Sequence, residues 1–387
     1  MTIIFWLSLI LILHSFIFYP VSLAVFNKIF SKEEVNKDLE EYPEISFIIA
    51  AHNEEKIIKK KLENAISLNY DPEKLEVIVA SDNSDDKTNH IVEDFIAEHQ
   101  EESLPEIRLY IVKERKGKTN AQNEAVRTAK GEIIAFSDAN TIWEKDSLKK
   151  LIAGFKDQSI GYICGGLQYV NDYDNITAES ESTYWNYDLK MREWESNIAS
   201  VTAGNGAIYA IRKSDYEDLK PIRCHDGTMP TVMVLKNKKA KYQKEAIAYE
   251  KAGENTGDEF KRKVRMFRGL PWNIFERFSK YNPFKTGWFS YFYFSHRTLR
   301  YSLYLFHILL LISNIFLWNQ HWIYNLALIG QLSFYLLALI GAVTKLKSKL
   351  FYLPYFYTMT IAAQLIAVIK SFLGKNKAVW DKAESTR

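Results

Sequence analysis

The sequence predicts a membrane-anchored α/β protein, with a doubly wound sheet domain between apolar segments near the two ends of the chain. Three observations support this prediction. Long stretches near both ends lack charged residues, as membrane-spanning helices do. Between them, short apolar runs alternate with amphipathic helical patterns, which is typical of parallel βαβ units. Polar residues follow three of the four apolar runs, where such sheets bind ligands.

The first apolar stretch covers residues 1–27, which contain no Asp, Glu, Lys or Arg. A helix that crosses the hydrocarbon layer needs about 20 apolar residues. A cleaved signal peptide is the alternative, but no basic residue precedes the stretch and no small-residue cleavage site is evident before Lys28. We therefore expect a retained membrane anchor.

The second apolar region, 301–344, contains no acidic or basic residue apart from His307 and His321. It is long enough for two crossings with a turn at 319–320, and 351–369 is a candidate third crossing. A buried soluble helical hairpin is the alternative for this region. We expect a multi-pass protein of the cell membrane.

Lysines beside these spans indicate the orientation. Lys28 and Lys32 follow the first span, and Lys345, Lys347 and Lys349 lie between the last two. Basic loops tend to be cytosolic, so the middle of the chain is expected in the cytoplasm, whereas the path of the last segment stays open. The chain is thus divided into a transmembrane helix (1–27), a cytosolic domain (41–280), an interfacial segment (281–300) and a C-terminal transmembrane region (301–374).

The cytosolic domain alternates predicted strands with predicted helices. Helical patterns lie near 54–67, 87–98 and 118–129. Strand, helix and strand at this spacing predict a right-handed, doubly wound sheet. The apolar runs predicted as buried parallel strands are Ile45–Ala51, Leu75–Ala80, Ile107–Val112 and Ile133–Phe136.

Several classes of protein are disfavoured. The net charge of only +3 gives no argument for a nucleic-acid partner. The two cysteines, Cys164 and Cys224, show neither a disulfide framework nor a metal-ligand spacing. No G-x-G-x-x-G follows the first strand and no G-x-x-x-x-G-K-[ST] is present, which argues against a dinucleotide oxidoreductase and a P-loop hydrolase.

The polar residues past the strand ends have two interpretations. Asn53 could cap the following helix, and the run from Asp82 to Asp86 could be turn and cap residues. Asp138 and Asn140 are harder to explain structurally. A carboxylate and an amide two residues apart, after a buried strand, can both reach a hard cation that bridges two phosphates.

From Ile45 to Leu270 the chain resembles glycosyltransferase family 2, especially its cellulose-synthase-like members. Eight segments that match in order are highly specific. They are SFIIAAHNEE (46–55), VIVASDNSDDKT (77–88), ERKGKTNAQNEAV (114–126), EIIAFSDAN (132–140), TAGNGAIYAIRK (202–213), HDGTMP (225–230), EAIAYE (245–250) and EFKRKVRMFRG (259–269).

The resemblance implies a type A glycosyltransferase fold, with a mixed doubly wound sheet and a nucleotide-sugar donor. In such a protein, Ala50, Glu54 and Asp82 would line the pocket for the base and ribose. Lys118 would lie near the phosphates, where its charge is favourable. A solvated lysine at a helix start is the alternative for Lys118.

The resemblance also implies a divalent cation, Mg²⁺ or Mn²⁺, at Asp138 and Asn140, which occupy the family's Asp-x-Asp position. The metal neutralises the departing diphosphate. Here an asparagine replaces the second carboxylate, and its amide oxygen is a neutral, weaker ligand.

Asp226 falls where the family places its catalytic base, which takes the proton from the acceptor hydroxyl in an inverting transfer. His225 stands where the family has an acidic residue, and it could tune the base or contact the acceptor. Gly204 and Asn205 resemble the family's loop near the donor sugar, where a small backbone leaves room for a ring.

Arg265 corresponds to the arginine of the Gln-x-x-Arg-Trp motif of processive polymerases, and it could bind diphosphate. Arg262 and Met266 fill the glutamine and tryptophan positions, so the resemblance implies sugar transfer but not processive polymerisation. The helical pattern at 179–197 carries aromatic residues for stacking on sugar rings or, as the favoured alternative, for packing: Tyr184, Trp185, Tyr187 and Trp194.

We therefore expect an inverting glycosyltransferase that moves a sugar from a UDP-sugar to a membrane-proximal polysaccharide or glycan acceptor, with no nucleic-acid partner. Transfer of a single sugar to a lipid-linked acceptor is the alternative within the enzyme class. A catalytically silent nucleotide-binding partner of a synthase, and a membrane receptor with a soluble sensor domain, are the alternatives outside it.

Overall fold

The structure of the chain is a computed structural model, and it describes residues 1–31, 41–100, 103–170, 176–251, 256–344 and 348–379. The chain forms two compact units. A helical unit comprises Met1–Val25, Asn255–Tyr281 and Tyr291–Asn376. A sheet unit comprises Phe26–Glu254, Asn282–Ser290 and Lys377–Arg387.

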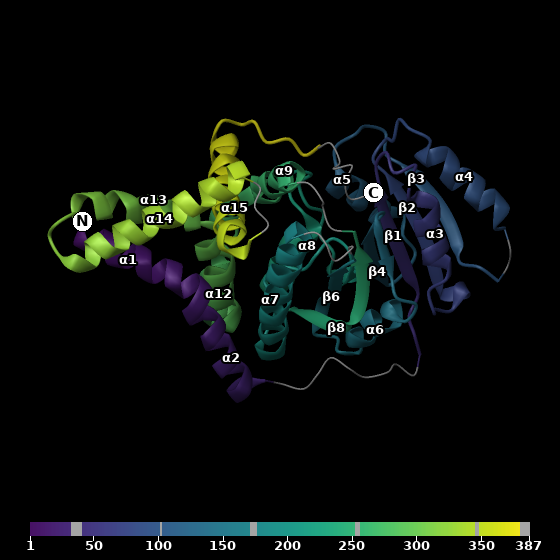
Figure 1. Cartoon of the computed structure of the whole chain (residues 1–387). Coiled ribbons are helices and arrows are strands. Elements are labelled where there is room, and N and C mark those ends of the chain that lie inside the picture. The colour runs from purple at the N-terminus through teal and green to yellow at the C-terminus, as the bar shows by residue number, and fades with distance from the viewer. Residues whose placement is uncertain (32–40, 101–102, 171–175, 252–255, 345–347, 380–387) are drawn as a thin grey trace. The chain divides into compact units, whose positions relative to one another are not determined.

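The sheet unit is built on one eight-stranded mixed sheet in the order β3-β2-β1-β4-β7-β6-β8-β5 (Figure 1). Strands β3, β2, β1 and β4 are parallel, and β7 pairs antiparallel with both β4 and β6. The strands are β1 Ile45–Ala51, β2 Leu75–Ser81, β3 Glu106–Ile111, β4 Ile133–Asp138, β5 Thr141–Trp143, β6 Ile160–Tyr169, β7 Tyr209–Arg212 and β8 Lys239–Glu250.

Helices cover both faces of this sheet, so the central strands β1, β2 and β4 are almost entirely buried. Alternate residues of β1 point to opposite faces: Phe47 joins the core under α3, α4 and α6, whereas Ile48 joins the core under α5 and α8. The helices of the unit are α3 Ile58–Ile66, α4 Thr88–Glu98, α5 Lys118–Thr128, α6 Ser147–Ala153, α7 Ile176–Ile198, α8 His225–Leu235 and α11 Pro283–Thr286.

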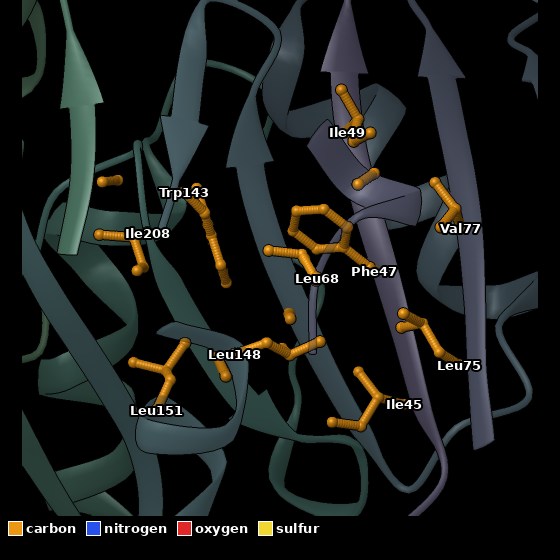
Figure 2. Close-up of a cluster of buried hydrophobic side chains, with 14 of the residues drawn as sticks. Ile45, Phe47, Ile49, Leu68, Leu75, Val77, Trp143, Leu148, Leu151 and Ile208 are labelled. Atoms are coloured by element: carbon orange, nitrogen blue, oxygen red, sulfur yellow. The ribbon is translucent and has the colours of Figure 1, made fainter. Parts of the chain in front are cut away.

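The first core centres on Phe47 and Trp143, whose rings meet edge to face with centroids 4.8 Å apart (Figure 2). Burying a side chain of this size stabilises the fold by roughly 1.5–3 kcal/mol. Lys61 of α3 is buried beside both rings, and its Nζ donates to the carbonyl oxygen of Thr141 at 2.8 Å. Burial lowers the pKa of Lys61 to about 7, although the Asp138 carboxylate opposes the shift. This bond fixes the chain just after Asn140.

The predicted α/β sheet is confirmed. The four predicted strands correspond to β1–β4, and the predicted helices at 87–98 and 118–129 correspond to α4 and α5. The sequence did not predict β5–β8 as strands. Of these, β5 and β7 have only three and four residues, and β6 and β8 are joined with register shifts, so none shows a clean alternation.

The helical unit contains the apolar segments at both ends of the chain. Within the part of the chain that the structure describes, three helices are long and apolar enough to cross a membrane: Thr2–Phe30, Trp322–Thr344 and Lys349–Phe372. The helices that lie wholly or partly in this unit are α1 Thr2–Leu13, α2 Tyr19–Phe30, α9 Thr256–Met266, α10 Leu270–Phe275, α12 Trp288–Phe292, α13 Leu303–Phe316, α14 Trp322–Thr344 and α15 Lys349–Phe372, with π-helical segments at His14–Phe18 and Tyr293–Leu299.

The predicted crossing that starts at residue 301 differs in form. Helix α13 has only 14 residues, so it is long enough to span only together with Trp288–Leu299, and the two segments are bent by 62°. The side chain of Gln364 on α15 donates to the carbonyl oxygen of Arg300 at 3.1 Å, in the break between them. A side chain inserted into the helical hydrogen-bond ladder is a common cause of such a bend.

Residues 255–281 pack within the helical unit, although the predicted cytosolic domain extends to residue 280. Apolar residues of α9 and of the turn that follows it explain this. Val264 and Phe267 are buried against Ala363 and Ala367 of α15. The segment that carries Arg265 therefore belongs with the membrane helices.

Candidate active site

The candidate site lies at the carboxyl ends of the parallel strands. In the β1–β4 register Ala50 is directly opposite Asp138, and in the β1–β2 register it is opposite Ala80, two residues before Asp82. Because parallel strands end at the same edge of a sheet, the polar residues that follow β1, β2 and β4 gather there.

Two loops are hydrogen-bonded to each other at this edge: residues 52–57, which follow β1, and residues 82–87, which follow β2. Together we call them the β1–β2 loops. Asn53 takes a positive φ of 56°, which asparagine tolerates, and its Oδ1 accepts from the backbone N–H of Asp85 at 3.0 Å. The backbone N–H of Glu54 donates to Oγ1 of Thr88 at 2.7 Å, and Glu54 itself is buried. Asn53 thus joins the two loops and does not cap α3.

Asp82 is buried and holds a third loop. Its two carboxylate oxygens accept from the backbone N–H groups of Lys116 at 3.1 Å and Gly117 at 2.9 Å. Gly117 has a φ of +96°, and a Cβ there would lie 2.7 Å from the carbonyl oxygen of Ala378. Only glycine suits this position, so Asp82 and Gly117 together set the start of α5 at Lys118.

Lys118 reaches from this loop to the end of β4, where its Nζ pairs with the carboxylate of Asp138. Burial lowers the pKa of Lys118, but the carboxylates of Asp138, Asp226 and Glu250 outweigh it and raise that pKa. One ammonium group therefore lies in the field of three carboxylates. We call Lys118, Asp138, Asp226 and Glu250 the charged cluster.

Asn140 follows β4, and its Nδ2 donates to Oε1 of Glu250 at 2.8 Å. Glu250 ends β8 and lies opposite Thr141 in the antiparallel β5–β8 register. The sequence prediction missed Glu250. Its place at the end of the EAIAYE segment, after a buried strand, is the signal that could have identified it.

Asp226 lies in the first turn of α8, where a carboxylate is favoured by the helix dipole. Its backbone carbonyl accepts from the N–H of Gly204 at 2.8 Å, which joins the glycine-rich loop to the helix. A Cβ on Gly204 would lie 1.9 Å from the hydroxyl of Tyr162, so a larger residue does not fit. Gly204 therefore lets the loop lie close to β6 beside Asp226.

Asn205 organises the same loop from within. It is buried, its Oδ1 accepts from the backbone N–H groups of Ala207 and Ile208 at 3.1 Å and 3.0 Å, and its Nδ2 donates to the carbonyl of Gly165 at 2.8 Å. These bonds shape the loop, so the side chain of Asn205 acts on the site through the backbone around Gly204.

His225 was predicted in the donor or acceptor pocket, but its imidazole is buried beneath the helix. Its Nε2 lies 2.9 Å from Oδ1 of Asn123 and 3.2 Å from the hydroxyl of Tyr216. Burial, helped by the charge of Lys118, lowers the pKa of His225 to about 3, so the ring is neutral at pH 7. His225 thus supports the turn that carries Asp226.

The structure brings together most of the predicted residues. Asp82, Asp138 and Asp226 are grouped around the segment 116–118, as described above. Arg265 lies in the helical unit, and the side chains of Tyr184 and Trp185 lie outside the described residues. Tyr187 and Trp194 lie on α7, where Lys190 is placed over the Trp194 ring.

The oxygen atoms at the end of β4 suit a hard divalent cation, because a carboxylate and an amide oxygen are both available. Among the described residues, no group of three or more His, Cys, Asp or Glu side chains could hold a metal ion. Any cation here would therefore need ligands from a bound molecule, as Mg²⁺ commonly takes from phosphates.

Two family profiles match the chain. The profile described as Glycosyl transferase family 2 matches residues 46–219, and that described as Glycosyl transferase family group 2 matches residues 133–369, more than half of the chain.

Curated relatives carry names of the same class of protein. The chain is 31% identical over 192 residues to "Probable glycosyltransferase YdaM" of Bacillus subtilis, covering 47% of this chain and 44% of the relative. It is 24% identical over 271 residues to the poly-β-1,6-N-acetyl-D-glucosamine synthase of Staphylococcus epidermidis, covering 65% of this chain and 64% of that protein. The match thus spans less than two thirds of these relatives.

Among solved structures, the fold is similar to the mannosyltransferase PcManGT from Pyrobaculum calidifontis, which was solved in complex with GDP-Man and Mn²⁺. The TM-score is 0.68 at 20% sequence identity, covering 96% of this chain and 100% of that one. The predicted type A glycosyltransferase fold with membrane helices at both ends is confirmed.

Proposed function

Because the chain belongs to glycosyltransferase family 2, we propose that it transfers a sugar from a nucleoside-diphosphate donor to a glycan acceptor beside the membrane, with inversion at the anomeric carbon. The observation that carries this proposal is the charged cluster, in which Lys118, Asp138 and Asp226 lie in one electrostatic environment. The cluster offers both a site for the leaving diphosphate and a base.

In this proposal the nucleotide binds along the β1–β2 loops. Ala50, Glu54 and Asp82 border the base and ribose, and the loop that Asp82 holds brings Lys118 to the phosphates. The lysine then exchanges its contact with Asp138 for the diphosphate oxygens. Arg265, on α9, is proposed as a second cation for the diphosphate.

Asp138 and Asn140 would hold a divalent cation, Mg²⁺ or Mn²⁺, through a carboxylate and an amide oxygen. Mn²⁺ accompanies GDP-Man in the structure of PcManGT, which supports such a cation. When bound, the cation offsets charge on the leaving diphosphate.

Asp226 is the proposed general base. The acceptor hydroxyl oxygen attacks the anomeric carbon while the bond from that carbon to the diphosphate breaks, and the hydroxyl proton moves to the Asp226 carboxylate. The bond electrons leave with the nucleoside diphosphate. The N–H of Gly204 holds the backbone of this residue in place.

A UDP-sugar is the proposed donor, carrying a hexose or an N-acetylhexosamine. The name of the staphylococcal relative, a poly-β-1,6-N-acetyl-D-glucosamine synthase, supports the N-acetylhexosamine. The acceptor is proposed to be a polysaccharide or glycan, with catalysis on the cytoplasmic side of the cell membrane. The lysines at 28 and at 345–349 favour this side.

Transfer of one sugar to a lipid-linked acceptor is the second candidate. Met266 stands where processive relatives carry a tryptophan, and the structure has three candidate spans, or four if the bent pair counts as one. The missing stacking surface favours single addition over polymer extrusion.

The proposal is tested by offering the detergent-solubilised protein a panel of UDP- and GDP-sugars with Mg²⁺, Mn²⁺ or EDTA, and with membrane extract as acceptor. We expect release of the nucleoside diphosphate with one donor, and a labelled lipid or polymer that distinguishes the two candidates. A protein that binds UDP but releases none from any donor would instead be the silent partner of a synthase.

A further inference from the structure

We infer that Glu250 is a positioning residue of the cation site: it orients Asn140 and supplies the negative charge that an Asp-x-Asp motif would carry at position 140. This inference rests on the proposed function. It starts from the polar contact of the Asn140 side chain, the 2.8 Å bond from its Nδ2 to Oε1 of Glu250.

The chemistry of this bond fixes which way the amide points. An ionised carboxylate only accepts hydrogen bonds, so the NH₂ group of Asn140 must face Glu250. The amide oxygen lies in the same plane on the other side of the Cγ atom, so it points away from Glu250 and is left as the candidate cation ligand. Partners that orient metal ligands in this way commonly tune metal affinity.

The backbone holds Glu250 in this place. Thr141 and Glu250 are opposite one another in the β5–β8 ladder, and the buried Lys61 holds the carbonyl of Thr141 from below. The backbone carbonyl of Glu250 also accepts from the N–H of Val170 at 2.9 Å. Glu250 is therefore held by strand pairing, and Asn140 lies in the short turn between β4 and β5.

Glu250 also contributes charge to the site. Its carboxylate is one of the three that act on Lys118, together with Asp138 and Asp226. An aspartate at position 140 would place a fourth carboxylate against Glu250 at hydrogen-bond distance, and like charges at that separation repel. The pair therefore has one carboxylate, carried by β8, and one neutral ligand, carried by the loop after β4.

The test measures Mn²⁺ binding in the presence of UDP by the electron paramagnetic resonance signal of free Mn²⁺, which does not depend on turnover. Glu250→Ala removes both the acceptor and the charge, and we expect Mn²⁺ affinity to fall about 10–100-fold, as for other outer partners of metal ligands. Glu250→Gln keeps an acceptor oxygen for Asn140, so its loss should be smaller. Glu245→Gln, on the same strand, is the matched control.

Rescue separates this role from a structural one. Asn140→Asp should bind Mn²⁺ more weakly than the unchanged protein. The double variant with Glu250→Gln should recover affinity, because the amide introduced at position 250 can donate to the new carboxylate. Thermal unfolding of each variant checks that it is folded. An unchanged affinity in Glu250→Ala, equal losses in Glu250→Gln and Glu250→Ala, or a double variant no tighter than Asn140→Asp, would each overturn the inference.

The experiment distinguishes failure of the proposed function from failure of the inference about Glu250. If the unchanged protein binds Mn²⁺ with UDP but transfers no sugar, the proposed function fails while the role of Glu250 can still be measured. If it transfers sugar and Glu250→Ala behaves as the unchanged protein does, the inference about Glu250 fails alone.

Discussion

The β1–β2 loops and the charged cluster lie at the same edge of the sheet but are built differently. In the loops, polar side chains are matched to backbone groups: Asp82 accepts two N–H bonds, and Asn53 joins its loop to Asp85. In the charged cluster, Lys118 pairs with Asp138, and the carboxylates of Asp226 and Glu250 also raise its pKa. The conformation of the loops is thus fixed by hydrogen bonds within the chain, whereas the ionised side chains of the cluster are suited to bind a charged ligand.

This difference predicts where substitutions act. A change in the loops should weaken nucleotide binding and lower stability together, because the same bonds serve both. A change in the charged cluster should reduce turnover with little effect on folding. Substitutions at single positions test this difference.

Asp226→Asn should have the largest effect. The amide cannot take the acceptor proton, so kcat should fall about 10²–10⁴-fold. The shape is conserved and only a favourable charge at the start of α8 is lost, so stability should fall by about 0.3–1 kcal/mol. Nucleotide release and thermal unfolding measure the two quantities. A variant with unchanged kcat would remove Asp226 from the reaction.

Asp82→Asn should act mainly on affinity and folding. An asparagine offers one acceptor oxygen, so its NH₂ group would face one of the N–H groups of Lys116 and Gly117. Leaving a buried donor without its acceptor costs about 1–3 kcal/mol. We expect a lower unfolding temperature and weaker UDP binding by calorimetry. Asp94→Asn, on the exposed face of α4, is the control that should change neither.

Gly204→Ala should destabilise the loop beside Asp226 by about 1–3 kcal/mol through overpacking against Tyr162. Tyr162 is buried, and its hydroxyl has no hydrogen-bond partner among the described residues. Tyr162→Phe alone should therefore be neutral or stabilising, and it should recover part of the loss when combined with Gly204→Ala. Gly330→Ala has open space and is the control.

Equal destabilisation of Gly204→Ala with and without Tyr162→Phe would contradict the packing between the glycine-rich loop and β6. Thermal unfolding of the four proteins forms a complete double-mutant cycle, which isolates the interaction between the two positions.

The last prediction is a pH dependence of stability from His225, which has the smallest effect at pH 7. Its pKa is about 3 in the folded protein and near 6.5 when exposed, so the unfolded chain binds the extra proton between these values. Stability from this residue is therefore present above about pH 6.5 and falls as the pH drops, by at most about 1.4 kcal/mol per pH unit. His225→Gln should flatten this slope, measured as unfolding temperature from pH 4 to 7.

The matched control is His90→Gln, since His90 is exposed on α4 and should leave the slope unchanged. A slope that persists in His225→Gln would show that other groups cause the acid sensitivity.

Much of the fold was predictable from the sequence because the signal was local. Buried parallel strands are continuous apolar runs, and Ile45–Ala51 and Ile133–Asp138 appear as such in the chain. The polar residues after them follow from strand direction alone. Membrane helices were likewise predictable from composition over a long window.

The remaining features depended on contacts between distant segments. Glu250 lies 110 residues from Asn140 in the sequence, and no local pattern indicates that the two side chains meet. The burial of His225 depends on Asn123 and Tyr216, which come from other elements. The bend before α13 is accompanied by a hydrogen bond from Gln364, which lies 64 residues beyond Arg300 in the chain. A sequence pattern predicts the helix or strand on which a residue lies. The roles of these three residues arise only when helices and strands pack against one another.

The central claim is that the β1–β2 loops serve nucleotide binding and the charged cluster serves turnover. It is tested most directly by measuring UDP affinity and kcat of both Asp82→Asn and Asp226→Asn. We predict a crossed result: Asp82→Asn binds UDP more weakly with the smaller loss of kcat, and Asp226→Asn binds UDP normally with little turnover. Parallel losses of affinity and turnover in both variants would contradict this division.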